Sequence, residues 1–185
     1  MQEMQKKIDQ ILDTLTAKDA DFEMIDIDVN GQTLPVYKSA PASLKDVYEI
    51  CLLHDQKTFL VYLEQRLSFR ETYQKAAGFS VALEKDFSVK KGDRVAIAMR
   101  NNPEWIIAFM AVTALGAVAV PMNGWWTTQE LKYGLVDSGA TLLIVDNQRL
   151  ERVRPILPEL PIAVICVEPE ETVDSIFSFD EPFPI

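Results

Sequence analysis

Residues 92–146 decide the fold, and they read GDRVAIAMRNNPEWIIAFMAVTALGAVAVPMNGWWTTQELKYGLVDSGATLLIVD. Three apolar runs in this stretch predict strands, at residues 94–99, 117–122 and 141–145. A helical pattern follows each of the first two runs. Near-continuous apolar strands that alternate with helices are typical of a parallel sheet covered on both faces. The sequence therefore predicts an α/β fold with a largely parallel sheet and helices on both faces.

Capping residues mark the two helices within this stretch. Asn102 is placed to cap the first helix, and Gly116 is placed to end it. Thr127 and Glu130 form a capping box for the second helix, which we expect to end before Gly139. Strand, turn and helix signals thus agree with one another along the whole stretch.

The pattern extends in both directions from this core. A basic helix at residues 148–157 and a fourth strand at 161–167 follow it. A helix at 70–85 precedes it, with Ser68 and Glu71 as a capping box. Further upstream we expect a helix at 43–53 and a β-hairpin built from the runs 58–63 and 67–69, turning at residues 64–65. Residues 168–185 contain six acidic residues and no basic ones, and they indicate either an exposed tail or an unfinished fold.

The N-terminal residues form a separate extension. Residues 1–18 have helical periodicity, and their apolar stripe consists of Met4, Ile8, Ile11, Leu12 and Leu15. Residues 22–37 alternate around Asn30-Gly31, which predicts a tight β-hairpin. We therefore divide the chain into an extension at residues 1–40 and an incomplete α/β subdomain at residues 41–185.

Composition excludes several classes of function. The 185 residues include 28 acidic and 18 basic ones, for a net charge of -10, which opposes binding to nucleic acid. No apolar run is long enough to span a membrane, and residues 1–15 lack the apolar region of a signal peptide. The two cysteines, Cys51 and Cys166, lie in apolar contexts that favour buried, reduced thiols. We expect a cytoplasmic protein.

Familiar catalytic motifs are absent from the sequence. The segment 134–141 has the glycines and threonine of a phosphate-binding loop, but it lacks the lysine and lies at a helix-to-strand junction. His54 is the only histidine, and we expect it to close a helix. These observations predict no catalytic residue and no metal site in this chain.

Two groups of side chains remain candidates for ligand contact. Trp125 and Trp126 lie in a loop after a predicted parallel strand, where ligands often approach, whereas Trp105 lies on the apolar face of its helix. Arg149 and Arg152, with Arg154, form the densest basic group. This group indicates either a solvated helix face or the site of an anionic ligand.

The order and spacing of four motifs resemble the N-terminal part of the adenylate-forming superfamily, specifically its AMP-forming acyl-CoA synthetases. They are LSFRETY at residues 67–73, GDRVA at 92–96, NPEW at 102–105 and LGAVAVPMN at 115–123. The resemblance covers residues 43–167. The extension at residues 1–40 also suits the fatty-acid branch of this family.

This resemblance implies a ligase that uses ATP and magnesium to convert a carboxylic acid, most simply a fatty acid, to an acyl-adenylate, and then transfers the acyl group to coenzyme A. It also implies an edge of the coenzyme A site. Gly124 and Trp125 fall on the relevant loop. Arg149 and Arg152 fall near the family's basic positions without matching their register.

The family's phosphate loop, its ribose-binding aspartate and its catalytic lysine are absent from the chain. We therefore expect an N-terminal fragment that is inactive by itself and whose partner is the remainder of the enzyme. Apolar surface left uncovered in such a fragment, together with the stripe on the N-terminal helix, predicts a homo-oligomer. The alternatives are a shortened, non-catalytic scaffold or dimerisation module, and an unrelated doubly wound domain that binds a small ligand.

Overall fold

The structure is a computed structural model that describes residues 1–167 and 176–178. The chain divides into two compact units, Met1–Ser43 and Leu44–Ile185, and each is described by itself.

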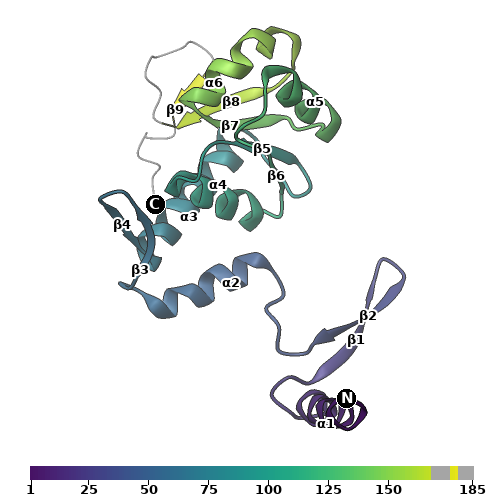
Figure 1. Ribbon diagram of the computed structural model, residues 1–185. Helices are drawn as coiled ribbons and strands as arrows, with labels where there is room; N and C mark the ends of the chain where they lie inside the picture. Colours follow the sequence, from purple (N-terminus) through teal and green to yellow (C-terminus); the bar gives the residue numbers. More distant parts are fainter. Residues whose placement is uncertain (168–175, 179–185) are drawn as a thin grey trace. The chain divides into compact units, whose positions relative to one another are not determined.

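The first unit is a helix followed by a two-stranded antiparallel hairpin (Figure 1). Helix α1 spans Gln2–Thr16, and strands β1 Met24–Val29 and β2 Gln32–Tyr37 pair through the whole of their length. Asn30 and Gly31, between them, have φ values of 53° and 82°. Both lie in the left-handed region that tight hairpin turns require. The predicted helix and hairpin are confirmed.

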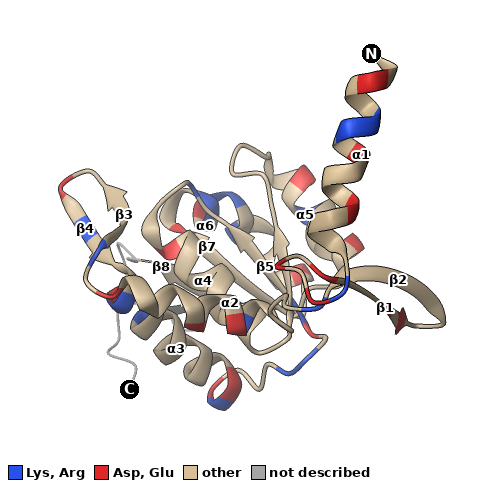
Figure 2. Cartoon of the chain, turned by 90° about the horizontal axis from the view of Figure 1, so that it is seen from below, with Lys and Arg blue, Asp and Glu red and all other residues tan. Residues whose placement is uncertain are grey.

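The apolar stripe of α1 is exposed. No side chain of this helix is buried, and Ile11 in the middle of the stripe is 58% exposed. Figure 2 shows acidic and basic residues interspersed along the same helix. The helix thus carries an apolar face that nothing in its own unit covers.

The second unit begins with a helical segment and a hairpin. Helix α2 (Leu44–Cys51) continues as a short 3-10 helix, η1 (Leu52–His54). Strands β3 (Thr58–Tyr62) and β4 (Gln65–Ser68) then form an antiparallel pair. The predicted turn at residues 64–65 is wrong by one position, because Tyr62 pairs with Gln65 and the turn is Leu63-Glu64.

The rest of this unit alternates helices with the strands of a five-stranded sheet, in the order β6-β5-β7-β8-β9 with every pair parallel. The strands are β5 Arg94–Ala98, β6 Val118–Pro121, β7 Leu142–Asp146, β8 Ala163–Val167 and β9 Ile176–Ser178. The helices are α3 Phe69–Lys85, α4 Pro103–Ala114, α5 Thr128–Ser138 and α6 Asn147–Val153, followed by the 3-10 helix η2 Arg154–Glu159. The predicted α/β class and parallel sheet are confirmed.

Each face of the sheet has its own apolar core, since successive side chains of a strand point to opposite faces. Val95 and Ile97 of β5 pack into a core with residues of α3 and α4. Ala96 and Ala98 of the same strand pack into a second core with residues of α5 and α6. Figure 1 shows the two helix pairs on opposite sides of the sheet. The small alanines on the second face leave room for larger helix side chains such as Leu131.

Two elements differ from the sequence prediction. The helix expected at residues 148–157 ends at Val153 and continues as η2, because Pro155 lacks the amide hydrogen that an α-helix needs at that position. Strand β9 was not predicted, and it lies in the acidic segment 168–185. The remainder of that segment lies outside the described residues. Neither cysteine forms a disulfide; Cys166 is buried and Cys51 is half-buried.

Capping boxes begin α3 and α5, as predicted. The Ser68 and Thr127 side chains accept hydrogen bonds from the amides of Glu71 and Glu130, and each glutamate reciprocates. Bonds donated first by the backbone amide and then by the hydroxyl of the cap residue hold the pKa of both glutamates below its usual range. Their charged forms therefore stabilise the folded state.

This lowered pKa predicts a specific pH dependence of stability. The contribution of Glu71 and Glu130 is present above the unfolded carboxyl pKa of about 4.3 and is lost as the pH falls through the lower, folded pKa. The double variant E71Q/E130Q should therefore be less stable than wild type at pH 7, and the two should converge in acid. Urea unfolding between pH 7 and pH 3 measures this. The control D137N removes an exposed carboxylate of α5 outside both capping boxes and should keep most of the wild-type stability at pH 7. A double variant whose loss of stability is the same at pH 7 and at pH 3 would refute the assignment.

Candidate functional site

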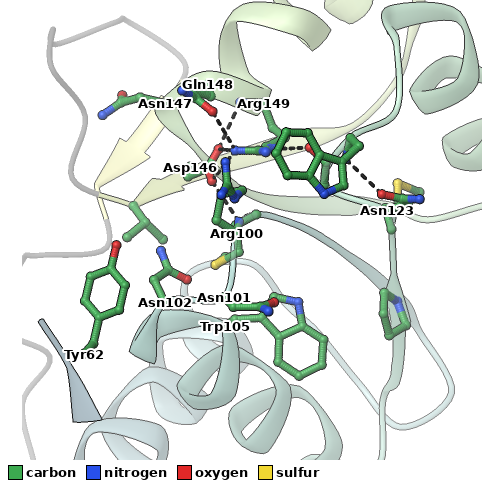
Figure 3. Close-up of a pocket in the computed structure, with 16 residues that line it drawn as sticks. Tyr62, Arg100, Asn101, Asn102, Trp105, Asn123, Asp146, Asn147, Gln148 and Arg149 are labelled. Atoms are coloured by element: carbon green, nitrogen blue, oxygen red, sulfur yellow. Dashed lines mark hydrogen bonds and ion pairs between the residues drawn. The ribbon is translucent and has the colours of Figure 1, made fainter. Parts of the chain in front are cut away.

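The second unit contains a cleft of about 790 Å³ at the carboxyl ends of its parallel strands (Figure 3). Three strand-end loops line it, at residues 99–102 after β5, 121–125 at the end of β6, and 146–149 after β7. Tyr62, Trp105 and Val167 complete the lining. We call it the strand-end cleft.

The strand order explains why a cleft forms here. The chain passes from β5 through α4 to β6 on one side, and then through α5 to β7 on the other side of β5. The helices that follow β5 and β7 therefore lie on opposite faces of the sheet, and the loops after these two strands diverge. Doubly wound sheets bind ligands in the crevice at such a reversal.

Asp146, at the end of β7, joins the two diverging loops. Its Oδ2 accepts a hydrogen bond from the backbone amide of Arg100, at 2.9 Å, across the reversal. Its Oδ1 accepts one from the amide of Arg149, also at 2.9 Å, and so caps α6. The Arg149 guanidinium then pairs with the carboxylate, with Nη1 at 2.8 Å from Oδ2. Figure 3 shows these groups grouped along one wall of the cleft.

Arg149 extends this network to the third loop. Its side chain is completely buried, and its Nε donates to the carbonyl oxygen of Gly124 at 2.7 Å. Nη1 of Arg152 donates to the same oxygen at 3.2 Å and to that of Trp126 at 3.0 Å. The basic part of α6, visible as the blue segment in Figure 2, is therefore directed at the backbone of residues 124–126. The expectation of a solvated helix face is wrong for Arg149.

Gly124 is fixed by close packing as well as by these bonds. A Cβ at this position would lie 3.1 Å from the carbonyl oxygen of Met99 and 3.4 Å from Nη2 of Arg149. The first of these atoms belongs to the backbone at the end of β5 and cannot rotate away. The loop after β6 thus approaches β5 and α6 so closely that a side chain at position 124 would be tightly packed against both.

The three tryptophans have different environments. Trp125 is 69% exposed and lines the cleft, and Cζ of Arg100 lies 4.5 Å from the centroid of its ring. Trp126 packs against the core between the sheet and α5. Trp105 is half-buried and stacks on Phe109, as expected for the apolar face of α4, yet it also lines the cleft. Of the pair considered for ligand contact, the structure places Trp125 at the cleft.

Asn102 differs from its predicted role. It occupies the N-cap position of α4, but its side chain makes no capping hydrogen bond. Its Oδ1 is buried and has no hydrogen-bond partner among the residues that the structure describes, and the residue lines the cleft. Nη2 of Arg149 is likewise buried and without a partner among these residues. A buried polar atom without a partner is costly, and both of these atoms belong to residues that line the cleft.

The structure brings together the four residues predicted for a coenzyme A edge. Gly124, Trp125 and Arg149 line the cleft, and Arg152 bonds to the loop that carries the first two. Contact with coenzyme A remains a prediction. His54 closes η1, with its ring 4.8 Å from that of Phe69, and lies away from the cleft lining.

Sequence reasoning missed Arg100 and the anchoring role of Asp146. Asp146 had a readable signal, because it ends a buried strand and immediately precedes a helix. Among the residues that the structure describes, no three acidic, histidine or cysteine side chains group to hold a metal ion. In the same residues no helix is both long and apolar enough to cross a membrane.

The fold and the cleft define a doubly wound α/β domain with a crevice at the reversal of strand order. The chain belongs to the AMP-binding enzyme family, whose model matches residues 49–182.

Named relatives agree with this assignment. The chain is 37% identical over 95 residues to 2-succinylbenzoate–CoA ligase of Bacillus velezensis and 33% identical over 92 residues to long-chain-fatty-acid–CoA ligase of Haemophilus influenzae. These alignments cover 51% and 50% of this chain, but only 20% and 16% of the relatives.

Solved structures show the same fold. The anthranilate CoA ligase AuaEII in complex with anthranoyl-AMP aligns with a TM-score of 0.71 and 27% identity, over 76% of this chain and 28% of that one. Coronafacic acid ligase from Pectobacterium brasiliense aligns with a TM-score of 0.69 and 21% identity, over 76% of this chain and 30% of that one. The sheet and helices described above therefore have the same fold as part of each of these two ligases.

The close packing around Gly124 gives a testable expectation. The variant G124A should lower the free energy of unfolding by about 1–3 kcal/mol, because its methyl group meets a fixed carbonyl oxygen. Thermal and urea unfolding measure the change. The variant A119G, in β6, serves as a comparison for a small change on the adjoining strand and should lose about 1 kcal/mol or less. Unchanged stability in G124A would show that the loop can move away from Met99.

Proposed function

We propose that this chain supplies the N-terminal part of an AMP-forming acid–CoA ligase. The family match over residues 49–182 carries the proposal. The named relatives, ligases that join 2-succinylbenzoate or long-chain fatty acids to CoA, support it. We infer a fatty acid as the substrate, because residues 1–40 suit the fatty-acid branch of the family.

The proposed reaction has two steps. The carboxylate of the acid attacks the α-phosphate of ATP, which gives an acyl-adenylate and releases pyrophosphate. The thiol of coenzyme A then attacks the acyl carbon, and AMP leaves. AMP is a far better leaving group than the oxygen of a free carboxylate, which is why activation precedes transfer.

Within this scheme the strand-end cleft is the proposed edge of the coenzyme A site. Trp125 offers an exposed ring at its mouth, and Gly124 lets the backbone approach closely. Arg149 and Arg152 hold the carbonyl oxygen of Gly124 from beneath and so fix the backbone of this loop. We assign no residue of this chain to ATP or magnesium. Because the chain aligns with only 20% and 16% of the length of the two ligases, we propose that activity needs segments that these relatives have in addition.

An activity assay tests the proposal. The 185-residue chain and the protein encoded by the complete reading frame that contains it are incubated with ATP, magnesium, coenzyme A and a panel of fatty and aromatic acids. We expect acid-dependent pyrophosphate release and acyl-CoA from the longer protein with fatty acids, and none from the chain alone.

The ligase function, the fatty-acid substrate and the need for further segments would each be contradicted by a different result of this assay. No pyrophosphate release from the longer protein with any acid would contradict the ligase function. Preference for aromatic acids would contradict only the fatty-acid assignment. Turnover by the chain alone that a substitution within the chain abolishes would contradict the need for further segments. A reading frame that ends at Ile185 would favour a scaffold instead.

We also propose that the chain self-associates through the stripe of α1. Met4 and Ile11 of the stripe are 68% and 58% exposed, and an isolated amphipathic helix of this length gains little stability unless its face is buried. Light scattering over a concentration series should show dimers or larger oligomers. The variant I8E/I11E should be monomeric, and the control Q10E/T14E, on the polar face, should behave as wild type. A wild-type monomer at every concentration would refute the proposal.

A further inference from the structure

In the network around Asp146, the complete burial of Arg149 is not explained by a gain in folding stability. Arg149 is completely buried, and a buried ion pair is often no more stabilising than apolar side chains of similar volume. Within the described part of the chain its Nη2 also lacks a hydrogen-bond partner, which adds a cost. A residue that is expensive to bury and sits beside a cleft is best explained by what it positions.

The partners of this pair show what is positioned. Asp146 holds the amide of Arg100 after β5, and Arg149 holds the carbonyl of Gly124 after β6. These two loops carry Arg100 and Trp125, whose cation–π contact spans the mouth of the cleft at 4.5 Å. The pair therefore fixes the backbone on both sides of that contact.

The hydrogen bonds from Arg149 and Arg152 also orient the backbone of the loop at residues 124–126. The carbonyl oxygens of Gly124 and Trp126 accept from Arg149 and Arg152, so both point toward α6. The residue between them, Trp125, is 69% exposed although its neighbour Trp126 packs into the core. The amide of Trp125 is bonded to Oδ1 of Asn123 at 2.9 Å, which completes the restraint on this loop.

We propose that Arg149 is a positioning residue: held by Asp146, it anchors the loop at residues 124–126 and so sets the pose in which Trp125 and Arg100 stand together at the mouth of the cleft. Arg149 acts through the loop and not by its own contact with a ligand. The inference rests on contacts within the chain and is independent of the proposed ligase function.

Fluorine NMR of the 185-residue chain labelled with 5-fluorotryptophan tests this, because its three tryptophans report on the loop, on the adjoining core and on α4. The variant W125F assigns the Trp125 resonance. In R149M this resonance should shift toward that of a freely exposed indole, with a smaller shift for Trp126 and little change for Trp105, while circular dichroism remains that of the folded protein.

Three further variants separate positioning from general destabilisation. D146N should shift the Trp125 resonance in the same direction, since it weakens the hold on Arg149. R149K should shift it less, because a single ammonium keeps the charge beside Asp146 but lacks the second arm that reaches Gly124. The control R154M removes an exposed arginine, paired with Glu151, that immediately follows α6, and should leave all three resonances unchanged.

Two results would overturn the proposal. One is an unchanged Trp125 resonance in folded R149M. The other is an equal shift of all three resonances, which would indicate a general structural role. If R149M fails to fold, R149K and D146N decide: a selective shift of the Trp125 resonance supports positioning, and its absence refutes it.

Discussion

The ion pair between Asp146 and Arg149 is the interaction on which the cleft depends. It lies where three parallel strands end, and its hydrogen bonds reach the backbone after each of them. Parallel strands β5 and β7 are held together along their length by their own ladder, but their loops leave toward opposite faces of the sheet. Without a bridge at this point, nothing in the ladder would fix the distance between those loops. One carboxylate and one guanidinium provide the bridge.

The ion pair between Asp146 and Arg149 also determines how much positive charge the cleft offers to a ligand. The cleft contains two arginines, Arg100 and Arg149, in a chain of net charge -10, which suggests attraction for an anion. Yet the Arg149 charge is compensated by Asp146, and most of its donors bond to the protein itself. The charge that remains for a ligand is mainly that of Arg100, which lies over Trp125. The site therefore presents a cation and an aromatic ring together and not a simple basic patch.

Much of the fold could be predicted from local signals. The capping boxes at Ser68 and Thr127, the glycine at position 139 and the alternating apolar strands each specify their structure through neighbours a few residues away. The burial of Arg149 could not be predicted in this way, because it depends on Asp146 and Gly124, which meet it only after β6 and β7 take their places. Asn102 failed as a cap for a related reason: its position is correct, but its side chain lies at the cleft without reaching the helix amides.

A double-mutant cycle between Asp146 and Arg149 tests the central claim most directly. The free energy of unfolding is measured for wild type, D146N, R149M and the double variant. If the pair is the bridge described here, the double variant loses less stability than the sum of the single variants, by about 1–3 kcal/mol. The exposed pair Glu151 and Arg154 is the reference, with an expected coupling below about 1 kcal/mol. Additive losses at Asp146 and Arg149, with a coupling no larger than that of the reference pair, would contradict the account.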